Sequence, residues 1–526
     1  MSELPTTFKP IGITRADKRL AALVFLVSFS VFATFHSGRI DFYDGDARFF
    51  VTERLVYPST PEEHGYTVQG ANGHWYTWYG YGQPVLAIPF YLIGRTLVHL
   101  TRTPTLRALI GNDAEHLRYS DLPGERVAVT YLNPIATALA AALLVLLCIR
   151  LGASRRASVA SALIFAFASL AMPHARSSFE HPLEELAVVG LLFALTAEPS
   201  WKSRAPLYAG LIIGYAGFTR ESAFVLGLVY AAGRLAVRHP DRRLAGYDVL
   251  RAGLAALPLF ALTLYTFWYR FHAIVPPSPI SRFVTSPLTG LAGLLVSPGK
   301  SLFLYSPTLL LGIAGLAETW RRSRHLVVAM IVAWVLYLGV HSRVTFWHGD
   351  WCWGPRYLLA LVPLMIPPVA LALDRYKTRA FRAFAIATVG LALLVNTGSI
   401  LFAYQCHYAR QHYEPWFYMR TSELYFNPRL SPLIGQWEGL PYVYRALGHD
   451  WDNIVDEGRA NWGSDRGNDD LRQAYRCRVI DLWPVHAWHI APGFLRPLWV
   501  LIMGFAIAVI MRLSHELLRA VREGDP

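Results

Sequence analysis

The sequence has few charged residues and very few cysteines, and both shortages narrow what the protein can be. Charged residues make up only 16% of the 526 residues, whereas about 25% is usual in soluble proteins. The 4 cysteines are too few for a disulfide scaffold, and they form no Cys-x-x-Cys or Cys/His metal spacing. The first apolar run has no cleavage site of small residues after it, so we expect it to remain as a membrane anchor.

Apolar and aromatic residues take the place of the missing charge. Hydrophobic residues make up 54% of the chain, and aromatic residues, with 16 tryptophans among them, make up 13%. Such a composition suits a protein that lines two membrane interfaces. The net charge of +13 does not indicate nucleic acid as a partner, because Lys and Arg of membrane proteins gather in cytoplasmic loops.

Apolar runs long enough to cross a bilayer recur along the whole chain. They predict an all-α polytopic membrane protein with about 12 transmembrane helices. Arg220 alone separates two of the runs, which predicts two short helices that meet near one surface. The expected spans are 20–36, 127–149, 157–174, 182–197, 205–219, 221–237, 252–272, 301–318, 326–341, 356–373, 383–403 and 494–511.

Lysine and arginine predict the orientation of these spans. Basic residues precede the first span, which places the N-terminus in the cytoplasm of a bacterial inner-membrane protein, and basic pairs such as Arg155-Arg156 then fall inside as well. The apolar segment 84–100 would reverse every later loop if it crossed, so we expect it to lie in the outer interface.

The expected organisation has three parts. A transmembrane module covers 1–403 and includes a long periplasmic loop at 37–126. A periplasmic, aromatic-rich insert follows at 404–493, and a last helix with a cytoplasmic tail occupies 494–526. Cys406 and Cys477 both lie in the insert, where an oxidising compartment would allow them to pair.

Ionisable residues gather at five turns on the expected periplasmic side. Charge is costly in a bilayer, so such residues mark candidate functional positions. A carboxylate there can act as a general base, and Arg or Lys can bind a phosphate. The five turns hold Asp44, Asp46 and Arg48; Glu180 and His181; Arg220; Lys300; and His348, Asp350 and Arg356.

Each of these residues also has a structural explanation, because Asp and Arg near an interface are often solvated loop residues. Asp44 and Asp46 form the stronger candidate for a functional site. Two acids this close beside a membrane repel each other, so such a pair is expected to serve a function. The structural alternative is a helical ion pair between Asp44 and Arg48, four residues apart. The Gly-Lys-Ser at Lys300 is not a phosphate-binding P-loop, because Leu294 stands where that motif needs glycine.

Four stretches carry a resemblance to a known family. They are the acidic motif 44–48, the aromatic run 75–84 with Pro89 after it, the turn 297–307 and the turn 349–357. Together they resemble the GT-C glycosyltransferases, near the aminoarabinose transferases, the protein O-mannosyltransferases and the bacterial RgtA/B/C/D-like group, over most of 20–403. Two positions depart from the family pattern, which usually has Lys where Trp78 stands and Arg where Lys300 stands.

The resemblance implies a GT-C-like bundle and a glycosyltransferase. Such an enzyme moves a sugar from a polyprenyl-phosphate donor to an envelope acceptor on the periplasmic face, with inversion at the anomeric carbon. The acceptor is a glycolipid, a polysaccharide or a protein, and the sugar is mannose, aminoarabinose, arabinose or galacturonate. The implied roles are catalytic for Asp44, Asp46 and Glu180; donor phosphate binding for Lys300, Arg356 and Arg220; and acceptor or sugar contact for Arg48, Tyr79, His181, His348 and Asp350.

Two further points stay open at this stage. No cofactor is required by this interpretation, although a divalent cation held by Asp44 and Asp46 is an alternative. A transporter or flippase of envelope lipids is the competing function. A transporter would place its ionisable residues near the middle of the bilayer, whereas here they cluster at the ends of spans. A non-catalytic scaffold is the third alternative, and the presence of Asp44, Asp46, Lys300 and Arg356 argues against it.

Overall fold

The structure is a computed structural model of the chain. It describes residues 10–38, 40, 43–59, 67–101, 124–197, 203–236, 242–276, 283–404, 407–408, 425–440, 480–485, 494 and 496–524. The two cysteines expected to pair, Cys406 and Cys477, lie outside these residues, and so does most of the expected insert 404–493.

The described chain is helical, which confirms the prediction of an all-α protein. Within it, one small antiparallel sheet pairs β1 (Val68–Gln69) with β2 (Trp75–Tyr76). Six helical segments are long and apolar enough to cross a membrane. They are Gly124–Arg150, Arg243–Phe271, Arg324–His341, Arg356–Arg375, Arg379–Leu401 and Arg496–Glu523.

Six of the twelve expected spans therefore correspond to long apolar helices, and the other six are shorter or more polar. Among these, α1 is a single helix, Arg15–Thr34, and α10 covers His181–Leu195. The expected span 157–174 is divided into α8 (Arg155–Phe167) and α9 (Ala171–Ala175). The expected span 301–318 is divided into α15 (Leu302–Tyr305) and α16 (Leu309–Arg322), with Pro307 between them. Proline has no N–H for the helical ladder, which accounts for this break.

The interruption at Arg220 is confirmed. Helix α11 (Ala205–Thr219) ends there, Arg220 adopts an extended backbone with φ −152° and ψ 119°, and η2 (Glu221–Val225) leads into α12 (Leu226–Leu235). Helix α11 packs closely against α13 (Arg242–Phe271). The contact needs glycine at position 210, since a Cβ there would lie 2.1 Å from the carbonyl oxygen of Ala252. The short α11 thus ends at a charged residue.

Burial separates the centre of the bundle from its periphery. The span Arg356–Arg375, made of η3 (Arg356–Leu361), η4 (Pro363–Met365) and α18 (Ile366–Arg375), is 89% buried. Of the most apolar 18 residues in Gly124–Arg150, made of α6 (Gly124–Thr130) and α7 (Leu132–Arg150), 78% are buried, whereas the corresponding stretch of α27 (Arg496–Gly524) has 0% buried. The apolar side chains of α27 are therefore available to lipid.

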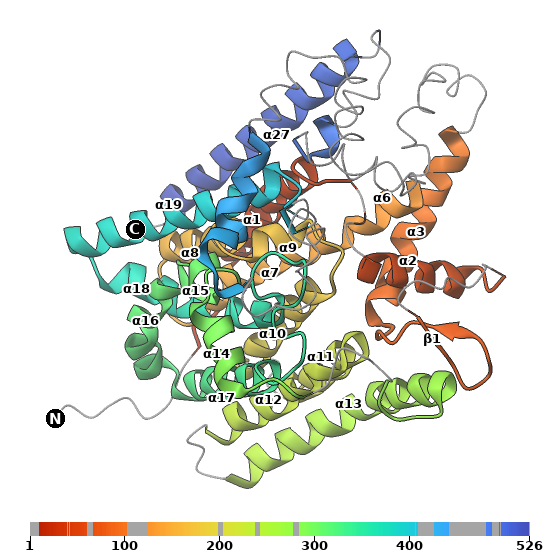
Figure 1. The fold of residues 1–526 in the computed structure, drawn as a ribbon. Helices are drawn as coiled ribbons and strands as arrows, with labels where there is room; N and C mark the ends of the chain where they lie inside the picture. The colour runs from red at the N-terminus through yellow and green to blue at the C-terminus, as the bar shows by residue number, and fades with distance from the viewer. Residues whose placement is uncertain are drawn as a thin grey trace.

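The long first loop builds one end of the molecule. Helix α2 (Tyr43–Val56), the small sheet and α3 (Gly82–Thr101) gather at the right of Figure 1, away from the two chain ends. Helix α3 packs on α2 and α6 and is not among the six long apolar segments. The position of α3 in the membrane interface stays a prediction. We call the part of the molecule formed by α2, the small sheet and α3 the α2 end.

The remaining described elements flank the loop 342–355 or follow the buried span. Helix α14 (Pro287–Val296) precedes the turn with Lys300, and α17 (Arg324–His341) precedes the loop 342–355. Helix α19 (Arg379–Leu401) follows the buried span, and the short elements η6 (Pro428–Leu430), α22 (Pro432–Gly435) and η7 (Gln436–Gly439) belong to the described part of the insert.

Candidate functional site

Asp44 and Arg356 form an ion pair at the α2 end, although 312 residues separate them. The Nη1 of Arg356 donates to the Oδ2 of Asp44 at 3.0 Å. Asp44 lies in the first turn of α2, and Arg356 opens η3 where its side chain is buried. The Arg356 guanidinium also lies 4.2 Å above the centre of the Phe179 ring. Asp44 and Phe179 therefore both fix the position of this guanidinium.

The surroundings of Asp44 keep its carboxyl ionised. Burial by itself would raise the pKa of Asp44, but the positive charges of Arg356 and Arg48 outweigh it and lower the pKa below the ordinary value. For Tyr79 the effect is opposite, because burial and the charge of Asp44 raise the pKa of its phenol. Asp44 is therefore a carboxylate at physiological pH, beside a tyrosine that keeps its proton.

Arg48 connects α2 to the turn before α10. It forms a buried ion pair with Glu180, and its Nη1 donates to the backbone oxygen of Asp44 at 3.2 Å. Its guanidinium lies 4.2 Å from the centre of the Tyr79 ring. The helical pair between Asp44 and Arg48 that the spacing allowed is thus replaced: Asp44 pairs with Arg356, and Arg48 pairs with Glu180.

Arg220 occupies the break after α11 and lies among polar groups of α10. Its Nη1 is 2.6 Å from Nε2 of His181 and 3.6 Å from Oε2 of Glu184, while its Nε is 3.9 Å from Oε1 of Glu180. Tyr337 of α17 donates to Oε1 of Glu184 at 2.5 Å. The helix break at Arg220 therefore brings a cation to the carboxylate of Glu184 in α10 and to that of Glu180, the residue before α10.

Asp44, Arg48, Glu180, Arg220 and Arg356 together are called the acid–arginine cluster below. Glu180 joins its two halves, because it contacts both Arg48 and Arg220. Tyr357 adds a shared wall, since its ring lies 4.7 Å from the Arg220 guanidinium and 5.2 Å from that of Arg356. His181 lies in the same wall, with its ring centre 5.9 Å from that of Tyr357.

Asp46 has a different partner from Asp44. Its Oδ1 accepts from Nη1 of Arg126 on α6 at 2.5 Å, and both side chains are partly exposed. Residues two apart on an α-helix point in nearly opposite directions, which explains the separate partners. In the described residues no group of three or more His, Cys, Asp or Glu side chains is placed to hold a metal ion.

Lys300 stabilises the loop 342–355. The ammonium group is fully buried and donates to the backbone oxygens of Asp350 and Cys352, at 2.7 Å each. This loop needs such support because Gly349, Asp350 and Gly354 all have positive φ, at 68°, 60° and 61°. A phosphate would have to displace these carbonyl contacts to bind the Lys300 ammonium.

Parts of the expected insert pack over this loop. Tyr425 stacks on the ring of His348 with a centroid distance of 4.4 Å, and the Tyr408 hydroxyl donates to the backbone oxygen of Cys352 at 3.2 Å. The Nδ1 of His348 accepts from the backbone N–H of Asp350 at 3.0 Å. Burial, together with the charges of Lys300 and Arg356, holds the pKa of His348 well below its usual value, so this imidazole is neutral.

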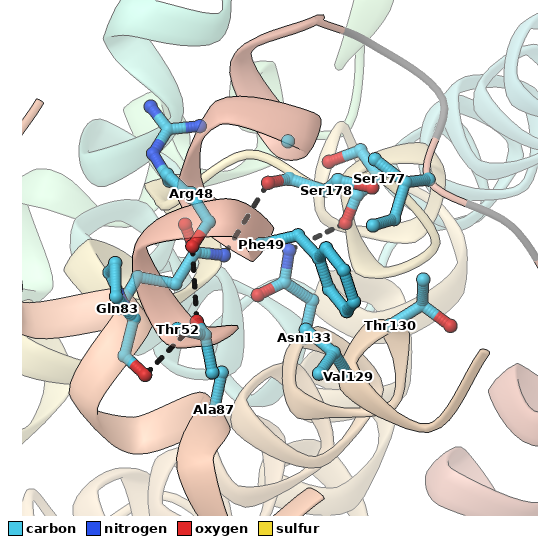
Figure 2. A pocket seen from close by; sticks show the side chains of 13 residues that line it. Arg48, Phe49, Thr52, Gln83, Ala87, Val129, Thr130, Asn133, Ser177 and Ser178 are labelled. Atoms are coloured by element: carbon cyan, nitrogen blue, oxygen red, sulfur yellow. Dashed lines mark hydrogen bonds between the residues drawn. The ribbon is translucent and has the colours of Figure 1, made fainter. Parts of the chain in front are cut away.

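A small pocket lies beside Arg48 on α2. Its volume is about 20 Å³, and its lining includes Gln83, Asn133 and Ser178 (Figure 2). Asn133 donates to the backbone oxygen of Ser177 at 2.6 Å, which holds the chain just before Glu180. A cavity of this size accommodates a water molecule but not a sugar ring.

Sequence reasoning missed three arginines that hold distant parts of the chain together, two of them at the α2 end. Arg126 is the last residue of the expected periplasmic loop 37–126 and lies outside the five turns that the sequence singles out. Arg270, at the end of α13, donates to the backbone oxygens of Thr77 and Tyr79 at 2.7 and 3.0 Å. Arg176 pairs with the buried Asp481 at 2.6 Å. An arginine at the predicted end of an apolar run was the available signal for Arg270.

No protein-family model matches the chain, and no curated protein matches it.

Proposed function

We propose that this protein is a membrane glycosyltransferase that takes a sugar from a polyprenyl-phosphate donor and passes it, with inversion, to an envelope acceptor on the periplasmic face. The observation that carries the proposal is the pair of Asp44 and Arg356. An ionised, largely buried carboxylate lies next to a buried arginine that can bind phosphate, at the end of the bundle formed by the long first loop. This matches the chemistry that a sugar transfer from a lipid phosphate needs.

The chemical roles follow from charge. Asp44 is the base that accepts the proton of the acceptor hydroxyl as this oxygen attacks the anomeric carbon. The bond from the anomeric carbon to the phosphate oxygen breaks, and the lipid phosphate leaves with the electron pair. Arg356 and Arg220 stabilise the phosphate through charge-assisted hydrogen bonds. Glu180 holds Arg48 and Arg220 in place, which makes it a positioning residue in this proposal.

Donor binding and activation of the base are coupled in this arrangement. The Arg356 guanidinium that pairs with Asp44 is also the cation offered to the phosphate. When the phosphate takes over part of that guanidinium, the carboxylate of Asp44 loses stabilisation and becomes a stronger base. The Asp44 carboxylate is thus a weak base without donor and becomes a stronger base when the donor is bound.

Other predicted residues take smaller parts in the proposal. Lys300, His348 and Asp350 shape the loop that ends at Arg356, and Tyr79 and His181 line the cluster. Asp46 is bound to Arg126, so the proposed reaction uses Asp44 alone as its base. The mechanism needs no cofactor.

The test begins in cells that carry and lack the gene. Mass spectrometry of lipid A, polysaccharide and periplasmic glycoproteins should show one glycan that lacks a single sugar in the deletion strain. Wild-type protein should restore that sugar, and Asp44→Asn at equal membrane abundance should not. An unchanged set of envelope glycans in the deletion strain would contradict the proposal.

A transporter of envelope glycolipids is the second candidate, and one observation favours it. Glu184 and Glu185 lie fully buried near the start of α10, so charge-bearing groups do extend into a helix of the bundle. A flippase would move lipid-linked glycans between the leaflets without changing their chemistry. Deletion would then leave an intact glycan on the wrong side of the membrane, whereas loss of a transferase changes the glycan's mass.

A further inference from the structure

A second and larger hollow lies along another side of α2, the helix that carries Asp44. Its volume is about 330 Å³, which is within the range of small-molecule sites. Ala47, Val51 and Arg54 of α2 line it at helical spacing. Since Ala47 is one turn from Asp44 on the same helix, a ligand in this hollow lies beside the acid–arginine cluster.

Aromatic rings line the hollow opposite α2. They are those of Trp75, Tyr76 and Tyr81 from the first loop and Tyr269 from α13, and Tyr76 meets Tyr269 edge to face at 6.5 Å. Arg270 fixes this wall, because it donates to the backbone of Thr77 and Tyr79. Its guanidinium also lies 4.3 Å from the Tyr81 ring centre. The same stretch of chain therefore forms the wall and presents Tyr79 to Asp44.

The hollow lies at the height of a membrane interface. Tyr265, Trp268 and Tyr269 are 57%, 53% and 52% exposed, and all three belong to the last two turns of α13. Exposed aromatic rings at the end of an apolar helix mark the level of lipid headgroups. A ligand that reaches the hollow along the membrane is consequently the headgroup of a lipid.

The lining favours an uncharged sugar ring over a phosphate. Of the described residues that line the hollow, Arg54 alone carries a charge, whereas Arg48, Arg220 and Arg356 meet in the neighbouring cluster. The C–H face of a sugar packs against an aromatic face, and its hydroxyls can bond with tyrosine and arginine. We propose that this hollow binds a sugar ring of a glycolipid acceptor and presents its hydroxyl to Asp44. The proposal rests on the proposed function for the fate of that sugar.

The experiment measures binding without turnover. The full chain carrying Leu55→Cys is placed in lipid nanodiscs, since Leu55 lines the hollow and is 44% exposed. Labelling of this cysteine by a fluorescent maleimide is timed with decyl glucoside, decyl mannoside or decyl galactoside present, and labelling of the chain without Leu55→Cys is subtracted. At least one glycoside should slow labelling several-fold, whereas decylphosphocholine, which has no sugar, should not.

A matched pair of variants tests the aromatic wall. Tyr269→Ala should raise the half-protecting glycoside concentration by roughly tenfold, the usual scale for removing one aromatic contact. Trp268→Ala is the control, because Trp268 is equally exposed on the same helix but does not line the hollow. An equal loss in both variants would overturn the proposal, as would equal protection by decylphosphocholine.

The outcomes also separate this site from the proposed reaction. Protection by farnesyl phosphate mannose alone, with none by the glycosides, would assign the hollow to the donor and overturn the acceptor proposal. Protection by glycosides together with envelope glycans that do not depend on Asp44 would support the sugar site and reject the transferase. A glycan that depends on Asp44, with no protection by any sugar, would reject the sugar site alone.

Discussion

Two acids in the first turns of neighbouring helices show how differently the two ends of the bundle use charge. Asp17 of α1 closes a capping box: it accepts from the backbone N–H and the hydroxyl of Thr14 at 2.8 and 2.6 Å. It also accepts from Nε of Arg155 at 2.7 Å. Its hydrogen bonds are thus directed to the helix end and to a basic loop, as expected of a structural acid.

In the described part of the chain, the Asp44 carboxylate of α2 is bound by an arginine side chain from a distant segment and not by a helix end. This carboxylate accepts from Arg356 and lies beside the buried phenol of Tyr79, and Ala47, one turn further along α2, lines the larger hollow. A carboxylate that is bound by a few side chains can exchange a partner for a substrate, whereas one that closes a capping box cannot do so without opening a helix. The comparison teaches that the partners of an acid, more than its position at a membrane surface, separate function from structure.

The largest expected difference between the two acids is in activity. Asp44→Asn keeps the size of the side chain and removes its basicity, so sugar transfer should fall by about 10²–10⁴-fold. Asp17→Asn and Asp46→Asn should each stay within a few-fold of wild type, because these acids pair with Arg155 and Arg126 instead. Transfer rates of the purified proteins, at equal folded amounts, provide the measurement. Near-wild-type transfer by Asp44→Asn would reject it as the base.

The second prediction concerns pH and tests whether Arg356 keeps Asp44 ionised. The pKa of Asp44 is below its ordinary value because the arginine charges outweigh burial. The stabilising effect of this pair is therefore present above about pH 4 and is lost as the pH falls further. In Arg356→Gln, one of the two arginine charges that lower the pKa of Asp44 is lost, so this pKa rises relative to wild type and the acid limb of kcat/KM should move to higher pH.

Arg356→Lys is the control for that shift, since it retains the charge. Its acid limb should stay near that of wild type, while its rate falls by roughly tenfold because Lys lacks the planar fork that binds phosphate at two points. Identical pH profiles for Arg356→Gln and wild type would show that the pair does not govern the ionisation of Asp44.

The third prediction extends the comparison to Arg220. Tyr337 donates to Glu184, and Glu184 lies 3.6 Å from Arg220. Tyr337→Phe removes that hydrogen bond and should weaken the placement of Arg220, so KM for the lipid-phosphate donor should rise about three- to tenfold with a smaller change in kcat. Tyr230→Phe is the matched control, because Tyr230 is equally buried and its hydroxyl has no hydrogen-bond partner in the described structure. A change in kcat alone would contradict a role in donor binding.

The sequence predicted elements better than it predicted contacts. Apolar runs and Lys or Arg at their ends marked the helices, and the lone Arg220 correctly marked a break, because these signals are local in the chain. The pairing of Asp44 with Arg356 could not be read from the sequence, since it depends on how a first-loop helix meets a turn 312 residues later. The sequence nevertheless marks both residues as candidate functional positions, because a charged side chain near a membrane is costly.

The roles inside the cluster were harder to assign than its membership. Asp44 and Asp46 looked equivalent in sequence, yet the helix turns them toward Arg356 and Arg126 respectively. Lys300 looked like a phosphate ligand, yet it holds two backbone carbonyls of a loop with three positive φ angles. The charge of a residue can be read from a sequence, but the group with which that charge pairs depends on the tertiary packing.

The smallest expected effect returns to Asp17 and concerns stability alone. Asp17→Ala removes the acceptor for the Thr14 backbone N–H, its hydroxyl and Arg155, and should lower the free energy of unfolding by about 1–2 kcal/mol. Thermal unfolding in detergent should register this loss, while the transfer rate per folded molecule stays unchanged. Asp44→Ala should show the reverse, with lost transfer and a stability change that depends on leaving Arg356 buried and unpaired. If Asp17→Ala abolished transfer at full stability, the division between a structural and a functional acid would fail.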